Sequence, residues 1–183
     1  ELFVKRHRKI LWKKAKWIGL VCLAVIVMAQ AGILFFPQIK QPINEGTLRI
    51  LPIFAFVLYG INGGTEFTQA LFVNCDHSLL TYSFYKQPES ILKLFTIRLR
   101  EIIKVNLFPA GIIAVGMAWI LFASGGTDNW LNYVVIFSSI ICMSIFFSVH
   151  YLTIYYLLQP YNAGTEIKNP AYQVVAGLTY FVC

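Results

Sequence analysis

Long apolar stretches separated by short polar segments run through the whole chain. Four of them hold about 20 residues or more, the length that an α-helix needs to cross the roughly 30 Å hydrocarbon core of a bilayer. These four stretches cover residues 17–36, 48–73, 105–123 and 130–158, and a fifth, incomplete one covers 174–183. We therefore predict an all-α, polytopic bundle of transmembrane helices with four complete spans and the start of a fifth.

Proline and glycine mark the expected ends of several spans. Pro37 follows the first span, and the residue before a proline is biased away from the helical conformation. Residues 38–47 are expected to form a short polar loop, and Gly125 and Gly126 to lie in a tight turn between the third and fourth spans. The fourth stretch is longer than one crossing requires, so we expect it to tilt or to project beyond the bilayer.

The composition supports the membrane class. Charged residues make up 13% of the 183 residues and hydrophobic residues 58%, whereas a soluble domain carries about 25% charged residues. The net charge of +7 is concentrated in residues 1–16, which form a basic segment next to a span and are accompanied by no zinc pattern or base-stacking motif. Membrane topology explains this charge better than nucleic-acid binding does. Residues 1–16 are expected either as a helix in the headgroup region or as a flexible basic tail.

The distribution of Lys and Arg predicts the orientation. If the N-terminus is cytoplasmic, the cytoplasmic segments hold thirteen of the fifteen basic residues, and the outside holds only Lys40 and Arg49. Cytoplasmic loops carry an excess of Lys and Arg. We therefore expect residues 1–16 to be a basic cytoplasmic segment and residues 17–183 a partial transmembrane domain of a bacterial cell membrane. Because the chain starts without Met and stops at Cys183 in an apolar run, we expect both ends to be truncations of a longer protein.

Motifs for catalysis, nucleotide binding and metal binding are missing from the sequence. It contains no GxxxxGK[ST] loop, no HExxH, no GxSxG and no cluster of Cys or His at metal-ligand spacing. The four cysteines show no paired spacing. We therefore expect no enzyme active site, no bound cofactor and no metal in this chain.

The second half of the second span is unusually polar. Asn62, Glu66 and Gln69 would share one face of a helix, and such residues face protein or water because lipid cannot satisfy them. We consider them a candidate translocation path, although for Glu66 a hydrogen bond between helices is the favoured explanation. The glycines Gly60, Gly63 and Gly64 would allow close packing or a bend, and close packing is the more common reason.

Residues 74–104 form the most informative segment. Gln87, Pro88 and Glu89 resemble a helix start, with proline at the first helical position and an acid in the first turn. From Ile91 onward apolar residues recur at helical spacing, with Lys93 and other polar residues opposite. We expect an amphipathic helix at the membrane surface between the second and third spans.

The order of features in this segment resembles the bacterial ABC exporter permeases of the type-2 class. The features are an acidic turn at the end of the second span, a Leu-Leu pair, a Tyr-x-x-Tyr-Lys-x-Pro stretch and the basic amphipathic helix. The Gln159-Pro160-Tyr161 stretch is similar as well. The resemblance implies that the loop after the second span docks on a separate ATP-binding subunit. The residues that it places in this coupling segment are Asp76, Leu79, Leu80, Tyr82, Phe84, Tyr85 and Pro88.

The resemblance implies the membrane subunit of an ATP-driven exporter, which pairs with a second permease subunit as a homodimer or a heterodimer. ATP would be bound and hydrolysed by the partner, with membrane lipid around the spans and no nucleic acid involved. A secondary transporter or channel without an ATPase is the main alternative. A membrane-embedded enzyme such as a lipid-modifying transferase, and a structural membrane protein, also remain open.

Overall fold

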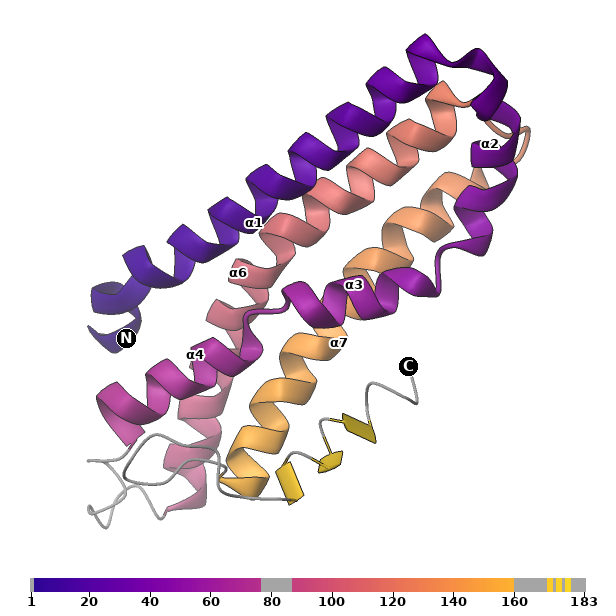
Figure 1. The fold of residues 1–183 in the computed structure, drawn as a ribbon. Helices are drawn as coiled ribbons and strands as arrows, with labels where there is room; N and C mark the ends of the chain where they lie inside the picture. The colour runs from indigo at the N-terminus through magenta and orange to yellow at the C-terminus, as the bar shows by residue number, and fades with distance from the viewer. Residues whose placement is uncertain (1, 77–86, 160–170, 173, 176, 179–183) are drawn as a thin grey trace.

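Every regular element in the described part of the chain is a helix, as expected (Figure 1). The computed structural model describes residues 2–76, 87–159, 171–172, 174–175 and 177–178, and gives the backbone alone at residues 2–11, 65, 66, 74 and 75. Three of the described helices are long and apolar enough to cross a membrane, as in a multi-pass membrane protein. The coupling-segment residues between 77 and 86, and most of the expected fifth span, lie outside the described residues.

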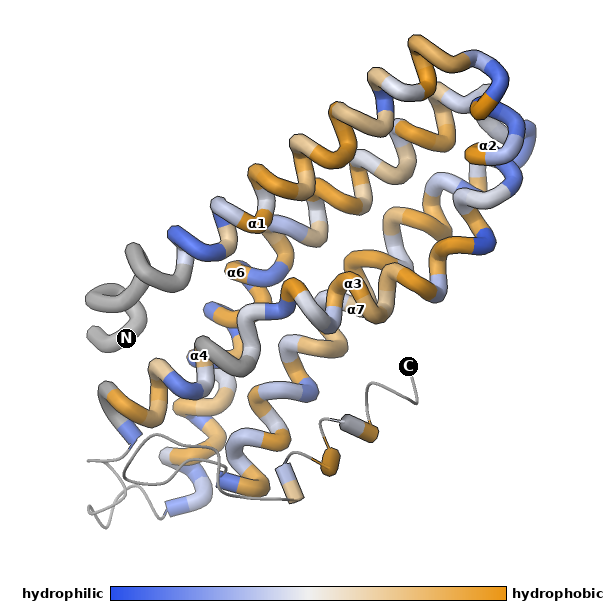
Figure 2. Tube along the Cα trace, in the orientation of Figure 1, coloured by the Kyte–Doolittle hydropathy of each residue, from blue (hydrophilic) through white to orange (hydrophobic). Residues whose placement is uncertain are grey.

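The first helix, α1 (Leu2–Phe35), joins the basic segment and the first expected span into one element. It ends two residues before Pro37, as the sequence predicts. Most of its described apolar side chains are exposed, and orange, hydrophobic segments recur along the α1 tube in Figure 2. Only 11% of its apolar stretch is buried inside the structure, against 50% for α6, so lipid or another polypeptide must cover the remainder.

The expectation of a polar loop at residues 38–47 was wrong. A short 3₁₀ turn, η1 (Pro37–Ile39), leads directly into the helix α2 (Lys40–Arg49). Pro37 occupies the first turn of η1, where its fixed φ is compatible with helical geometry. The segment is polar because it lies at the end of the bundle, and polarity alone did not distinguish a surface helix from a loop.

The second expected span is divided into several pieces. Its helical parts are α3 (Ile53–Ile61), α4 (Gly64–Leu71) and the π-helical turn η2 (Phe72–Asp76). Asn62 separates α3 from α4 with an extended ψ of 125°. The predicted shared face is therefore absent, because Asn62 does not belong to the helix that carries Glu66 and Gln69.

The expected surface helix and the third span form one continuous helix, α6 (Pro88–Ala123). Its start is confirmed: Pro88 lies in the first turn together with Glu89. At 1.5 Å per residue, 36 residues extend over about 54 Å, well beyond the roughly 30 Å of a hydrocarbon core. The helix ends at Ala123, as predicted for the third span.

The predicted glycine turn and fourth span are both present. Gly125 and Gly126 have φ values of +131° and +75°, which residues with a Cβ rarely adopt. The following helix, α7 (Leu131–Leu158), matches the predicted stretch to within one residue at its start.

Helix α6 lies between α1 and α7, and α3 and α4 pack against α7 (Figure 1). Close packing of α1 on α6 depends on Gly19 and Gly116, where a Cβ would press against Phe108 and Ile26 respectively. The starts of α1 and α6 and the ends of η2 and α7 share one end of the bundle, here called the N-terminal end. The opposite end, called the far end, holds α2 and the glycine turn.

Candidate functional site

Two groups of buried polar side chains connect α4 with α6 and α7. One lies at the N-terminal end of the bundle and is called the Asp76 cluster, consisting of Asp76, Arg98, Tyr155 and Tyr156. The other lies at the interruption between α3 and α4 and is called the Asn106 cluster, consisting of Asn62, Gly63, Gly64, Asn106 and Ser148. Both join segments that are distant in sequence.

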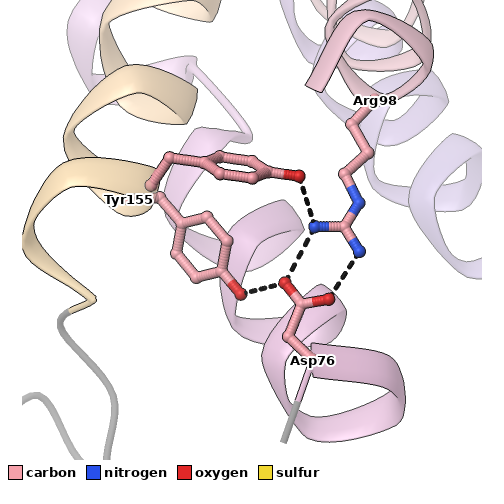
Figure 3. A network of polar contacts seen from close by, with 4 residues as sticks. Asp76, Arg98 and Tyr155 are labelled. Carbon is pink, nitrogen blue, oxygen red and sulfur yellow. Dashed lines mark hydrogen bonds and ion pairs between the residues drawn. The ribbon is translucent and has the colours of Figure 1, made fainter. Parts of the chain in front are cut away.

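Asp76 and Arg98 form a buried, bidentate ion pair (Figure 3). Arg98 Nη2 donates to Asp76 Oδ1 at 2.5 Å, and Nη1 donates to Oδ2 at 2.8 Å. The whole residues are 2% and 5% exposed, respectively. Two parallel bonds from the planar guanidinium hold the carboxylate in both position and orientation.

Two tyrosines of α7 complete the Asp76 cluster. The Tyr155 hydroxyl donates to Asp76 Oδ2 at 2.5 Å, and Arg98 Nη1 donates to the Tyr156 hydroxyl at 2.6 Å. The guanidinium carbon also lies 5.6 Å from the centroid of the Tyr156 ring, within the range of a cation–π contact. The last residue of η2, the eleventh residue of α6 and the last turn of α7 are thereby joined.

Apolar side chains surround the Asp76 cluster and exclude water from it. Phe67, Leu71 and Phe72 contribute from the α4 side, Ile102 from α6, and Leu152 from α7. In such surroundings an ion pair is attractive only if its remaining polar atoms are also bonded. Both carboxylate oxygens of Asp76 have partners, so the cluster holds helices together and offers no vacant carboxylate to a ligand.

The Asn106 cluster provides hydrogen-bond acceptors for the backbone N–H groups at the interruption between α3 and α4. Asn106 Oδ1 accepts the Gly63 N–H at 3.1 Å, and Asn62 Oδ1 accepts the Gly64 N–H at 2.8 Å. Asn106 Nδ2 donates to Asn62 Oδ1 at 3.2 Å and to Ser148 Oγ at 2.9 Å. An asparagine side chain that accepts a nearby N–H competes with the helical hydrogen bond, which explains why the helix stops here and restarts.

Close packing accompanies the interruption. A Cβ built on Gly64 would lie 2.5 Å from Cγ of Tyr151, whereas one on Gly60 would meet nothing within 4 Å. Gly64 therefore provides the close contact between α4 and α7 that the sequence suggested for this glycine group. Gly60 does not.

The structure brings together only some of the residues expected to be functional. Asp76 and Asn62 lie in the two clusters, Pro88 starts α6, and Gln69 is exposed on α4. Glu66 belongs to α4, but its side chain is outside the described set, as are Leu79, Leu80, Tyr82, Phe84 and Tyr85. Their roles remain predictions.

The sequence predicted Arg98 to be a topology signal and Tyr155 and Tyr156 to be anchors at the membrane interface, and it did not single out Asn106. A signal for Arg98 was available, because it shares helical spacing with Phe95 and Ile102 and so lies on the apolar face of its helix. A cation at such a position needs a buried partner. Asn106 follows on the same side of α6, four residues after Ile102.

Among the described residues, no group of three or more His, Cys, Asp or Glu is placed to hold a metal ion. The chemistry that the two clusters provide is attachment of helices to one another. No protein-family model, curated protein or solved structure matches this chain.

Proposed function

We propose that this chain is the membrane-spanning permease subunit of an ATP-driven exporter in a bacterial cell membrane. A separate ATP-binding subunit, which binds and hydrolyses ATP, would dock on the segment between Asp76 and Pro88. A second permease subunit would pair with this one, as a homodimer or a heterodimer. The chain itself carries no catalytic residue and no cofactor in this proposal.

The proposed topology has a cytoplasmic N-terminus and four complete spans. The first, third and fourth spans are α1, α6 and α7, and the second is α3 and α4 in series. The excess of Lys and Arg at the N-terminal end of the bundle supports this orientation. The first turns of α6 then extend beyond the bilayer into the cytoplasm, since α6 exceeds one crossing by roughly 16 residues.

The observation that carries the proposal is the way the Asp76 cluster holds both ends of the 77–86 segment. Asp76 immediately precedes this segment, and Arg98 lies in the helix that follows it. Their ion pair, together with Tyr155, ties the two ends to each other and to α7. A partner that moved the segment would therefore move η2, α6 and α7 as well.

The continuity of α6 supports the transmission of such a movement through the membrane. Apart from the hydrogen bond that Pro109 cannot donate, α6 continues as one helix from Pro88 to Ala123 at the far end, and a hydrogen-bonded helix is stiff over several turns. A tilt imposed on its first turns would displace its last turns, and with them the space between α1, α6 and α7. This is the kind of motion that alternating access requires.

Co-purification tests the proposal directly. The full-length protein is extracted in mild detergent, and the bound polypeptides are assayed for ATP hydrolysis. We expect an ATPase to co-purify with the wild type and to be lost from the Leu79→Asp/Leu80→Asp variant, because two carboxylates would disrupt an apolar contact. Gln38→Asp/Gln41→Asp, at the exposed far end, is the matched control and should retain the ATPase.

Absence of any ATPase from well-folded wild-type protein would contradict the exporter assignment. Retention of the ATPase in the Leu79→Asp/Leu80→Asp variant would instead show that the 77–86 segment is not its binding site. Elution as a single species in size-exclusion chromatography identifies the variants that fold.

Topology is tested with single cysteines in a background without native cysteines. A cysteine at Lys40 should react with a membrane-impermeant maleimide in intact cells, and one at Lys93 only after permeabilisation. The opposite pattern would reverse the proposed orientation and place the 77–86 segment outside the cell.

A secondary transporter is the alternative function, and the Asn106 cluster favours it. Interrupted helices with buried polar residues are typical of the binding sites of secondary transporters, and Asn62 and Asn106 form such an interruption. This alternative predicts transport in vesicles that is driven by an ion gradient in the absence of ATP. The exporter proposal predicts none.

A further inference from the structure

A cavity of about 240 Å³ lies between α1, the interruption of α3 and α4, and α6. Ala15 and Ile18 line it from α1, Ile61 and Phe67 from the second span, and Pro109 from α6. These side chains are apolar, and they come from three elements far apart in sequence. The cavity therefore lies between packed elements of the fold, is open on one side, and is distinct from the continuous exposed surface of α1.

Asn106 and Lys14 are the two polar side chains that line the cavity. The amide of Asn106 already has hydrogen-bond partners within the protein: its Oδ1 accepts from the Gly63 N–H, and its Nδ2 donates to Asn62 and to Ser148. It places no demand on an occupant for a hydrogen bond. An apolar cavity without unmet polar groups excludes water and takes up hydrocarbon.

Lys14 brings a positive charge to one edge of the cavity. It is exposed and is the thirteenth residue of α1, beside the exposed Lys13 and Lys16. A lysine at this depth keeps its ammonium in the headgroup layer while its stem follows the apolar wall. The cavity thus combines an apolar interior with a cationic edge at the level where lipid headgroups lie.

We propose that this cavity binds the acyl chain of an anionic lipid, whose headgroup pairs with Lys14. Since an apolar cavity of about 150 Å³ accommodates benzene, 240 Å³ accommodates about nine carbons of a chain. The rest of the chain would remain in the bilayer. The proposal requires only that the bundle lies in a membrane, so it does not depend on the ATP-driven exporter function.

Photolabelling in vesicles tests the proposal with the full-length protein. The probes are a phosphatidylglycerol and a phosphatidylcholine that carry the same diazirine in one acyl chain, and a diazirine derivative of palmitate. Labelled positions are found by mass spectrometry of peptides. Labelling around the exposed Met28 of α1 serves as the standard for bulk lipid.

We expect phosphatidylglycerol to label the cavity wall near Ala15 and Pro109, and phosphatidylcholine to label it about fivefold less, because one basic residue near a bilayer attracts an anionic lipid by roughly that factor. Labelling by palmitate as strong as by phosphatidylglycerol would identify free fatty acid as a source. Labelling by phosphatidylglycerol alone would identify the bilayer phospholipid. Equal labelling by phosphatidylcholine overturns the pairing with Lys14.

Two pairs of variants distinguish lipid bound in the cavity from lipid at nearby surfaces. Ala15→Leu fills the cavity and should lower its labelling at least fivefold, whereas Ala24→Leu, the same change at an exposed position of α1, should leave it unchanged. Lys14→Ala should lower labelling by phosphatidylglycerol about fivefold. Lys13→Ala, which alters the surface charge equally, should not.

Ala70→Leu provides a second filling variant on the α4 wall, in case Ala15→Leu disturbs the packing of α1. Cavity labelling that stays equal to that of the wild type, relative to the Met28 standard, in both filling variants would overturn the proposal. Uniform labelling of the wild type along α1 would also overturn the proposal, because it would show only contact with the surrounding bilayer lipid.

Discussion

The ion pair between Asp76 and Arg98 gives the most decisive prediction about what holds the bundle together. Substitution of Arg98 by methionine preserves most of the apolar stem and removes the guanidinium. Asp76, which is 2% exposed, then keeps only its bond from Tyr155 and loses both bonds from Arg98. A buried charge left without its partner destabilises a protein by about 3–5 kcal/mol.

Asp76→Asn removes the other charge and should destabilise by a similar amount, because the buried guanidinium of Arg98 then faces a neutral amide. The double variant Asp76→Asn/Arg98→Met lacks both charges and should be destabilised by only about 1–3 kcal/mol, since replacing both members of a buried pair is far less harmful than replacing one. The two single effects are therefore expected to be strongly non-additive, with a coupling of about 3 kcal/mol or more.

Unfolding by sodium dodecyl sulfate in mixed micelles, followed by tryptophan fluorescence, measures the free energy of unfolding of all four proteins. Arg100→Met is the matched control, because Arg100 lies on the same helix and is exposed. Its effect should stay within about 0.5 kcal/mol. Arg98→Lys should fall between the wild type and Arg98→Met, since lysine keeps the charge and loses the bidentate geometry.

Additivity of the two single variants within about 0.5 kcal/mol would refute the reasoning, because independent sites behave in that way. Single-variant effects below about 1 kcal/mol would refute it as well. Either result would mean that the Asp76 cluster does not hold the ends of the 77–86 segment, and the main support for the proposed coupling role would be lost.

The interruption of the second span gives two further predictions, measured by the same unfolding assay. Gly64→Ala should destabilise the protein by about 1–3 kcal/mol, because the added Cβ would overlap Tyr151. Gly60→Ala, where the added Cβ meets nothing, should be neutral or stabilise by up to about 1 kcal/mol. Equal effects of the two substitutions would contradict the packing argument. Asn106→Leu should destabilise by about 1–3 kcal/mol, since it removes the acceptor for the Gly63 N–H, and no loss would show that another group satisfies this N–H.

Hydropathy predicted the long helices well because it depends on local sequence. Three of the four apolar stretches correspond to single long helices, and the ends at Phe35, Ala123 and Leu158 agree with the prediction to within one residue. The glycine turn and the start of α6 at Pro88 were also predictable. In each case the determining signal is a proline, a glycine or the length of an apolar run.

Hydropathy could not show whether adjacent helical segments join or separate. Residues 38–47 are helical although polar, and the surface helix expected before the third span is continuous with it in α6. Pro42 in the polar segment lies in the first turn of α2, where proline is tolerated, and residues 89–104 contain no proline or glycine that would stop a helix before the third span. Propensity alone therefore left both outcomes open, and packing at the end of the bundle decided between them.

The sequence by itself determined that this is a helical membrane protein, where its long helices lie, and that the polar residues 62–69 must avoid lipid. Only the tertiary structure decided which polar residues pair. Asp76 is 22 residues from Arg98 and 79 from Tyr155, and Asn106 is 43 from Gly63. Such pairs form because helix packing brings their positions together, and a buried polar group is stable only with a partner.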